Sequence, residues 1–196
     1  MFETITPLAL LITVIVSFIA SLISGIAGFG GALFLLPIIC LFVDIKIAVP
    51  ILTIGQIFGN ASRVYFGRKE LAWKPIGYFL ISAVPMTVIG SYLFSIFDAR
   101  IIKTIVGLLL LVLLVYRHVK KKEYYIKNTG VIIGGGFTGF ISGIAGSAGP
   151  LGAAIFLGLR LSPSAYIASE AVTALSMHIL KFSYTKNIAR LDGVNY

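Results

Sequence analysis

Charge is scarce in this sequence. Charged residues make up 12% of the 196 positions and only seven of them are acidic, whereas soluble domains carry about 25% charged residues. Hydrophobic residues reach 58% and the mean hydropathy is +1.02. A chain with this composition could not cover its apolar surface with polar groups in water. The composition excludes an ordinary soluble domain and predicts an all-α polytopic membrane protein.

Cysteine and histidine are also nearly absent. The one cysteine, Cys40, excludes an internal disulfide and a metal centre built from cysteines. The two histidines, His118 and His178, lie 60 residues apart, and the sequence contains no HExxH motif, no paired intramembrane aspartates and no Ser–His arrangement of a known enzyme type. We therefore predict no enzymatic activity, no cofactor and no metal.

The basic residues are distributed between the hydrophobic runs. They give a formal net charge of +9, but their placement indicates membrane topology and not nucleic-acid binding. The strongest cluster, RHVKKKEYYIK, starts at Arg117, and its assignment to the cytoplasm puts the N-terminus outside. The sequence thus predicts a multi-pass protein in the cytoplasmic (cell) membrane of a prokaryote, in contact with membrane lipid.

Eight apolar segments follow one another along the chain. A full helical span needs about 20 residues, but the second and the seventh segments have only twelve each. Short segments at matching places in two halves are typical of discontinuous helices around a binding site. The segments are residues 8–27, 32–43, 47–66, 75–97, 101–116, 131–145, 150–161 and 165–184.

A glycine-rich motif of ten residues occurs twice. SGIAGFGGAL at residues 24–33 recurs 118 residues later as SGIAGSAGPL at residues 142–151, with seven identical positions. Five segments precede the second copy, so it enters the membrane from the opposite face. We predict an inverted repeat of about five segments: a first membrane repeat at 1–118, a basic cytoplasmic linker at 119–129 and a second repeat at 130–196.

The second repeat is expected to be incomplete. Counterparts of the fourth and fifth segments are absent before residue 196. Two interpretations remain open: the chain is truncated and lacks its last two spans, or a completing partner chain or a homo-oligomer supplies them.

The duplicated break suggests an anion site. An interrupted helix exposes backbone N–H groups at the positive end of its next half, and glycine lets an anion approach them closely. Close packing of helices through small residues is the alternative for any single glycine. The predicted substrate-binding residues are Ser24, Gly28, Gly30, Gly31, Gln56, Asn60, Ser142, Gly146, Ser147 and Gly149.

Polar residues are placed along the third and eighth segments. Thr53, Gln56 and Asn60 share one helical face, and the last two are expected to line the substrate path. Glu170 and His178 are candidates for ion coupling. The alternatives are a first-turn anion for Glu170, favoured by the helix dipole, and a structural hydrogen bond for His178.

Two cations occupy equivalent places in the two halves. The offset of 118 pairs Arg63 with Lys181, and likewise Asn60 with His178. Long basic side chains near helix ends commonly extend toward the membrane interface. We expect this of Arg63 and Lys181, with attraction of anions into a vestibule as the alternative.

The two motif regions resemble a known family. SGIAGFGGALFLLP and SGIAGSAGPLGAAIFLGLRLSPSAYIASEAVTAL are similar to the paired signatures of the TauE/SafE family of sulfite-exporter-like permeases. The second copy departs from the first at Ser147 and Ala148, where the first has Phe29 and Gly30.

The resemblance implies a secondary transporter of a small anion such as sulfite, thiosulfate or a sulfonate. Alternating access about the two breaks is the expected mechanism, with proton or sodium coupling left open. A membrane subunit or assembly factor without transport activity of its own is the alternative function.

Overall fold

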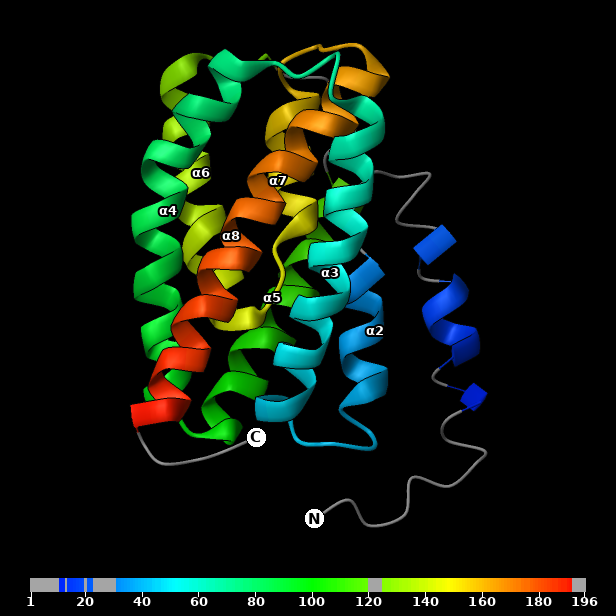
Figure 1. The fold of residues 1–196 in the computed structure, drawn as a ribbon, viewed down its shortest axis with the longest axis vertical. Coiled ribbons are helices and arrows are strands. Elements are labelled where there is room, and N and C mark those ends of the chain that lie inside the picture. The colour runs from blue at the N-terminus through cyan, green and yellow to red at the C-terminus, as the bar shows by residue number, and fades with distance from the viewer. Residues whose placement is uncertain (1–10, 13, 20, 23–30, 120–124, 192–196) are drawn as a thin grey trace.

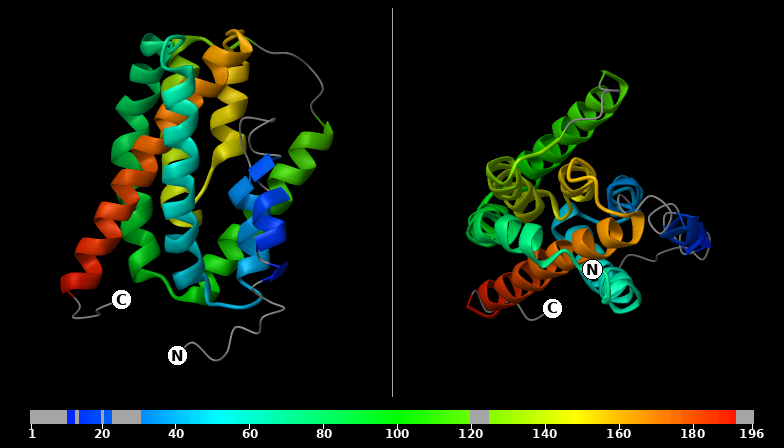
Figure 2. Two further views of the ribbon diagram at one scale, coloured as in Figure 1. Left: turned by 45° about the vertical axis from the view of Figure 1, so that its right-hand side comes forward. Right: turned by 90° about the horizontal axis from the view of Figure 1, so that it is seen from above.

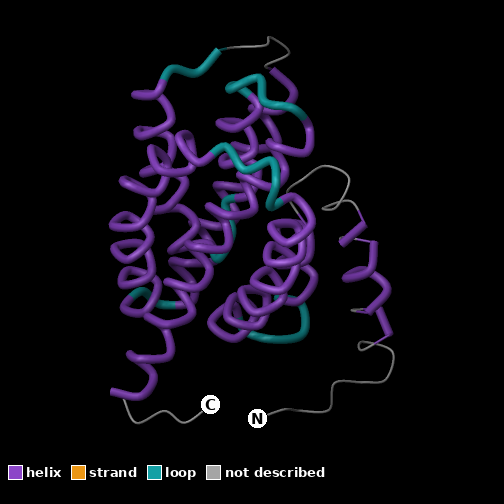
Figure 3. Tube along the Cα trace, turned by 45° about the horizontal axis from the view of Figure 1, so that its top comes forward, coloured by secondary structure: helices purple, strands orange, loops and turns teal. Residues whose placement is uncertain are grey.

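The computed structural model describes residues 11–12, 14–19, 21–22, 31–119 and 125–191. Within this part of the chain the secondary structure is helical and contains no strand, as Figures 1 and 3 show, so the all-α prediction is confirmed. The helices are α2 (Gly31–Ile39), α3 (Ile45–Gly67), α4 (Trp73–Ile96), α5 (Ala99–Val119), α6 (Asn128–Ala145), α7 (Gly149–Leu157) and α8 (Pro163–Leu191).

The helix bounds repeat with the spacing of the sequence motif. Helix α2 covers 31–39 and α7 covers 149–157, while α3 begins at 45 and α8 at 163, so all three boundaries differ by 118. Each of α2 and α7 has nine residues, or about 13.5 Å at 1.5 Å per residue, roughly half of a 30 Å hydrocarbon core. Both end before the predicted apolar segments do, because hydropathy does not separate a helix from an apolar turn.

The repeated helices run in opposite directions. In Figure 1 α3 rises from the bottom of the view to the top, whereas α8 descends, and the two helices pack against each other. Helix α2 occupies the lower half of the same view and α7 the upper half. The top view in Figure 2 places α3, α4, α6, α7 and α8 in one bundle, with α5 extending away from it.

Helices α3 and α4 are each long and apolar enough to cross a membrane, by length and composition. Their 18-residue windows have mean hydropathies of 1.2 and 1.8. Because only about a third of each window is buried inside the protein, most of these apolar side chains face outward, as lipid contact requires.

The most extensive helix contact is between α4 and α6. Gly135, Gly139 and Gly143 of α6 are spaced by four and form a stripe on the face toward α4. A Cβ built at Gly139 would lie 2.3 Å from the carbonyl oxygen of Ala83, and one at Gly143 would lie 2.7 Å from that of Thr87. The two backbones therefore touch through glycine, as is common between membrane helices.

Helix α3 starts at a defined cap. The Asp44 side chain accepts a hydrogen bond from the Lys46 N–H at 2.9 Å and pairs with Lys103 Nζ at 3.0 Å. The Lys46 N–H, assisted by Lys103, lowers the pKa of Asp44 below its ordinary value.

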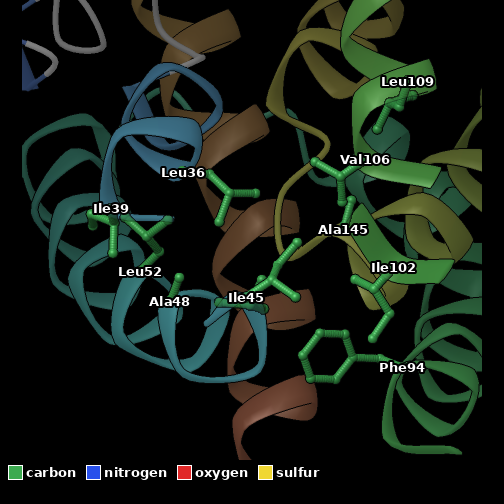
Figure 4. Packing of buried hydrophobic residues seen from close by; sticks show 11 residues of the cluster. Leu36, Ile39, Ile45, Ala48, Leu52, Phe94, Ile102, Val106, Leu109 and Ala145 are labelled. Carbon is green, nitrogen blue, oxygen red and sulfur yellow. The ribbon is translucent and has the colours of Figure 1, made fainter. Parts of the chain in front are cut away.

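The cap adjoins the first of two apolar clusters. Figure 4 shows that α2, α3, α4 and α5 contribute Leu36, Ile45, Phe94 and Ile102 to it, and Ala145 joins them from the end of α6. The end of α6 is thus fixed in a core built by the first half of the chain.

The Asp44 cap is testable by substitution. Asp44→Ala removes the acceptor and is expected to lower the free energy of unfolding by about 1 kcal/mol, whereas Asp44→Asn keeps an acceptor and loses only an exposed ion pair of small value. Thermal unfolding in detergent measures both. Since the pKa of Asp44 is lowered, the carboxylate contributes stability above its unfolded pKa and loses it as the pH falls through the folded value. Equal losses for both variants at neutral pH would contradict the cap.

The α4–α6 contact predicts a contrast between two glycines of one helix. Gly139→Ala forces the backbones apart and should destabilise the protein by about 1–3 kcal/mol. Gly136→Ala is the matched control, because a Cβ there meets nothing closer than 3.4 Å and alanine favours the helix. Melting temperatures in detergent measure the stability of both variants. A Gly139→Ala variant as stable as Gly136→Ala would show that α4 and α6 do not touch through their backbones.

Candidate functional site

The second motif interrupts a helix inside the bundle. Helix α6 ends at Ala145 and α7 begins at Gly149, and Figures 1 and 2 show this connection part-way along the bundle, whereas the α3–α4 and α4–α5 connections lie at its ends. Gly146 has φ 82° and its N–H donates to the Ser142 carbonyl at 3.0 Å. A Cβ at Gly146 would also lie 2.7 Å from Val49 Cγ1. Conformation and space both require glycine here.

Gln56 of α3 joins the interruption to the first half of the chain. Its Nε2 donates to the Gly146 carbonyl at 3.3 Å, and its Oε1 accepts from the Ser147 hydroxyl at 3.2 Å. The structure therefore brings together three of the predicted site residues. Because these groups are polar and Ser147 is buried, the amide of Gln56 satisfies backbone that α6 and α7 leave unpaired.

The first turn of α7 has no side-chain cap. Its N-cap is Ala148, which has no hydrogen-bonding side chain, and Gly149 and Pro150 follow. The N–H groups of Leu151 and Gly152 donate to the Ala148 carbonyl at 2.9 and 3.2 Å. This helix end carries about half a positive charge, directly after Ser147.

Lys181 of α8 reaches the same place, which corrects the prediction that it extends toward the interface. Its side chain is 2% exposed. Its Nζ lies 3.5 Å from the Ser142 carbonyl, 4.7 Å from the centre of the Phe94 ring, and 3.4 Å from where a Cβ of Gly146 would be. The negative end of α6 and an aromatic face take the place of water around the ammonium. We call Gln56, Gly146, Ser147 and Lys181 the break cluster.

A second cluster of polar side chains lies nearer the end of α3 and nearer the start of α8. Arg63 Nη1 is 3.6 Å from Glu170 Oε2, and Arg63 Nη2 donates to Asn60 Oδ1. Glu170 and Asn60 are buried, while Arg63 keeps 20% of its side-chain surface exposed. Asn60 thus lies beside Arg63. We call Asn60, Arg63 and Glu170 the ion-pair cluster.

The position of Glu170 excludes one of its alternatives. It is the eighth residue of α8, and the first turn of that helix has no acidic residue, so Glu170 is not a first-turn anion. Instead its Oε1 is 3.4 Å from where a Cβ of Gly152 would be, close to the positive end of α7. The Glu170 carboxylate thus lies beside the first turn of a neighbouring helix and not in that of its own.

His178 lies between the two clusters along α8. It is 3% exposed, and its Nδ1 has no hydrogen-bond partner within the described residues. The structural hydrogen bond considered for it is therefore not made through Nδ1. Other polar and apolar side chains of α8 are buried along with it: Glu170, Thr173, Met177 and Lys181.

The other predicted binding residues have different positions. Ser142 is buried and its carbonyl receives Gly146 N–H and Lys181. Gly31 is the first residue of α2. Ser24, Gly28 and Gly30, in the first copy of the motif, lie outside the described residues.

Two cations were missing from the predicted binding residues. The repeat offset that pairs Arg63 with Lys181 was the signal that could have marked both residues as equivalent polar positions of the two halves. Each lies in a polar cluster, Arg63 with Glu170 and Lys181 at the helix interruption.

One comparison with known proteins identifies the family. The model of the sulfite exporter TauE/SafE family matches residues 13–193. The chain belongs to the TauE/SafE family. No curated protein and no solved structure matches it. TauE/SafE proteins are membrane transport permeases, which agrees with the apolar helices α3 and α4. The resemblance inferred from the paired motifs is confirmed.

The ion-pair cluster predicts unequal effects of its two charges. Arg63→Met leaves a buried carboxylate without its cation and should cost about 3 kcal/mol of stability. Glu170→Gln should cost less, because Arg63 retains Asn60 and some exposed surface. The double variant should be more stable than Arg63→Met alone, since no uncompensated carboxylate remains. Melting curves of the three purified proteins measure this; additive losses would show that the two side chains do not interact.

Proposed function

We propose that this TauE/SafE protein is a secondary transporter that carries a small anion across the cell membrane, of the sulfite, thiosulfate or sulfonate type. The observation that carries the proposal is the helix interruption at Gly146–Ala148. There the uncapped start of α7, the Ser147 hydroxyl and the Gln56 amide meet inside the bundle.

These groups fit an oxyanion chemically. The N-terminal end of α7 attracts negative charge, and the Ser147 hydroxyl and the Gln56 amide carry hydrogen-bond donors beside it. Each neutral donor contributes modestly to the binding of an anion.

An inverted repeat is part of the proposal. It is supported by helix bounds that recur after 118 residues and by the opposite directions of α3 and α8. The first repeat, residues 1–118, would then contribute one half of the site through Ser24, Gly28, Gly30 and Gly31. The second repeat, residues 130–196, would contribute the other half. Alternating access about such a midplane site follows from this symmetry.

Topology and coupling complete the proposal. The N-terminus lies outside and the basic linker at 119–129 lies in the cytoplasm, as the distribution of Lys and Arg favours. Glu170 and His178 are the candidates for proton or sodium coupling, because both are buried near the path and ionisable groups inside a membrane are usually functional.

Transport by purified full-length protein in lipid vesicles tests the function. Saturable uptake of radiolabelled sulfite, thiosulfate or methanesulfonate is expected. Removing the Ser147 donor with Ser147→Ala should reduce uptake about three- to tenfold, the effect of one hydrogen bond. Ser176→Ala is the control, because among the described residues that hydroxyl donates to the Val172 carbonyl of its own helix. A folded protein without saturable uptake of any of these anions would favour a subunit or assembly factor.

A further inference from the structure

Lys181 places an ionisable amine in the break cluster, and no carboxylate of the described residues forms an ion pair with it. The ion pairs in that part of the chain join Arg63 to Glu170 and Lys103 to Asp44. Among the described residues, the polar and aromatic contacts of Lys181 Nζ are the Ser142 carbonyl at 3.5 Å and the Phe94 ring at 4.7 Å. An ammonium has three donors, so these contacts satisfy it weakly.

A buried ammonium without a counter-charge lowers the stability of the protein, so its presence suggests a function. Removing an ammonium from water without a counter-charge is strongly unfavourable, and the half charge at the end of α6 offsets part of it. Apolar residues of similar volume would fill the same space at lower free energy. Buried ionisable groups at membrane depth commonly bind a substrate or an ion.

We propose that Lys181 binds the negatively charged head group of the transported anion at the break, and that the site takes one negative charge. This inference rests on the proposed function. Gly146 provides the space, because the ammonium is 3.4 Å from where its Cβ would be. Ser147 and the start of α7 follow in the chain and add uncharged donors around the same point.

The limit of one charge follows from the charges around the break: Lys181 is one cation, whereas Glu170, whose carboxylate lies near the start of α7, is already paired with Arg63. Glu170 and Lys181 are eleven residues apart on α8, or about 16 Å along the helix. The Arg63–Glu170 pair is internally neutral, so it supplies no second cation to the break. A dianion at the break would keep one charge unbalanced in a desolvated place. The site therefore favours a singly charged oxyanion, such as a sulfonate, over a doubly charged one of the same shape.

The first experiment measures the role of Lys181. Uptake of radiolabelled methanesulfonate into vesicles is compared for the full-length protein and the variants Lys181→Met, Lys181→Arg and Lys103→Met. Lys181→Met should lose about 30-fold or more, the effect of removing a desolvated charge partner. Lys181→Arg should recover part of the activity, and the exposed Lys103→Met should match the wild type. Wild-type uptake by Lys181→Met overturns the inference and leaves the transport function intact.

Binding is measured separately from flux. Methanesulfonate should raise the melting temperature of the wild type and of Lys181→Arg, because it binds the folded state, but not that of Lys181→Met. Without ligand, Lys181→Met should melt at the wild-type temperature or above, since it removes an unpaired buried charge. A lower melting temperature together with an undiminished ligand effect would make Lys181 structural and overturn the inference. Ligand stabilisation that depends on Lys181, without any flux, would support the binding site and refute transport.

The charge limit is tested with a matched pair of anions. Methanesulfonate and sulfate are both tetrahedral, but the second carries an additional charge in place of a methyl group. Sulfate should inhibit methanesulfonate uptake at least about tenfold less effectively. Equal or stronger inhibition by sulfate would refute the restriction to one charge.

Discussion

The interruption of a helix inside a membrane-embedded bundle requires that its backbone groups find partners within the protein. Lipid offers none, and each unpaired group costs several kcal/mol. In this TauE/SafE protein the partners come from outside the interrupted helix. Gln56 of α3 donates to the Gly146 carbonyl and accepts from the Ser147 hydroxyl, and Lys181 of α8 approaches the Ser142 carbonyl of α6. The arrangement of α3 and α8 follows from this requirement, since both must reach the same place.

Glycine has two different functions in the second motif. Gly143 allows α6 to approach α4 closely, because any side chain there would collide with Thr87 and Ser91. Gly146 instead adopts a left-handed conformation that ends the helix. Close packing thus accounts for Gly143, and a left-handed helix end accounts for Gly146, three positions further along. One short motif therefore both packs α6 against α4 and ends α6.

The sequence predicted the elements better than the contacts. Hydropathy and the repeat located the helices and the half-length pair α2 and α7, since both depend on local composition. The face shared by Thr53, Gln56 and Asn60 followed from helical spacing. The sequence did not predict the position of Lys181, because the groups around its ammonium belong to other helices. They are the Ser142 carbonyl of α6 and the Phe94 ring of α4. The Arg63–Glu170 pair likewise depends on how α3 and α8 are aligned, which no spacing within one helix specifies.

The glycine stripe of α6 has a consequence for motion. Helix α4 belongs to the first half of the chain and α6 to the second, yet their backbones touch through Gly139 and Gly143. Separating the two halves of the chain as rigid bodies would break this close backbone contact. An opening toward one side of the membrane that preserves the contact divides the bundle along another line, with α4 and α6 moving together.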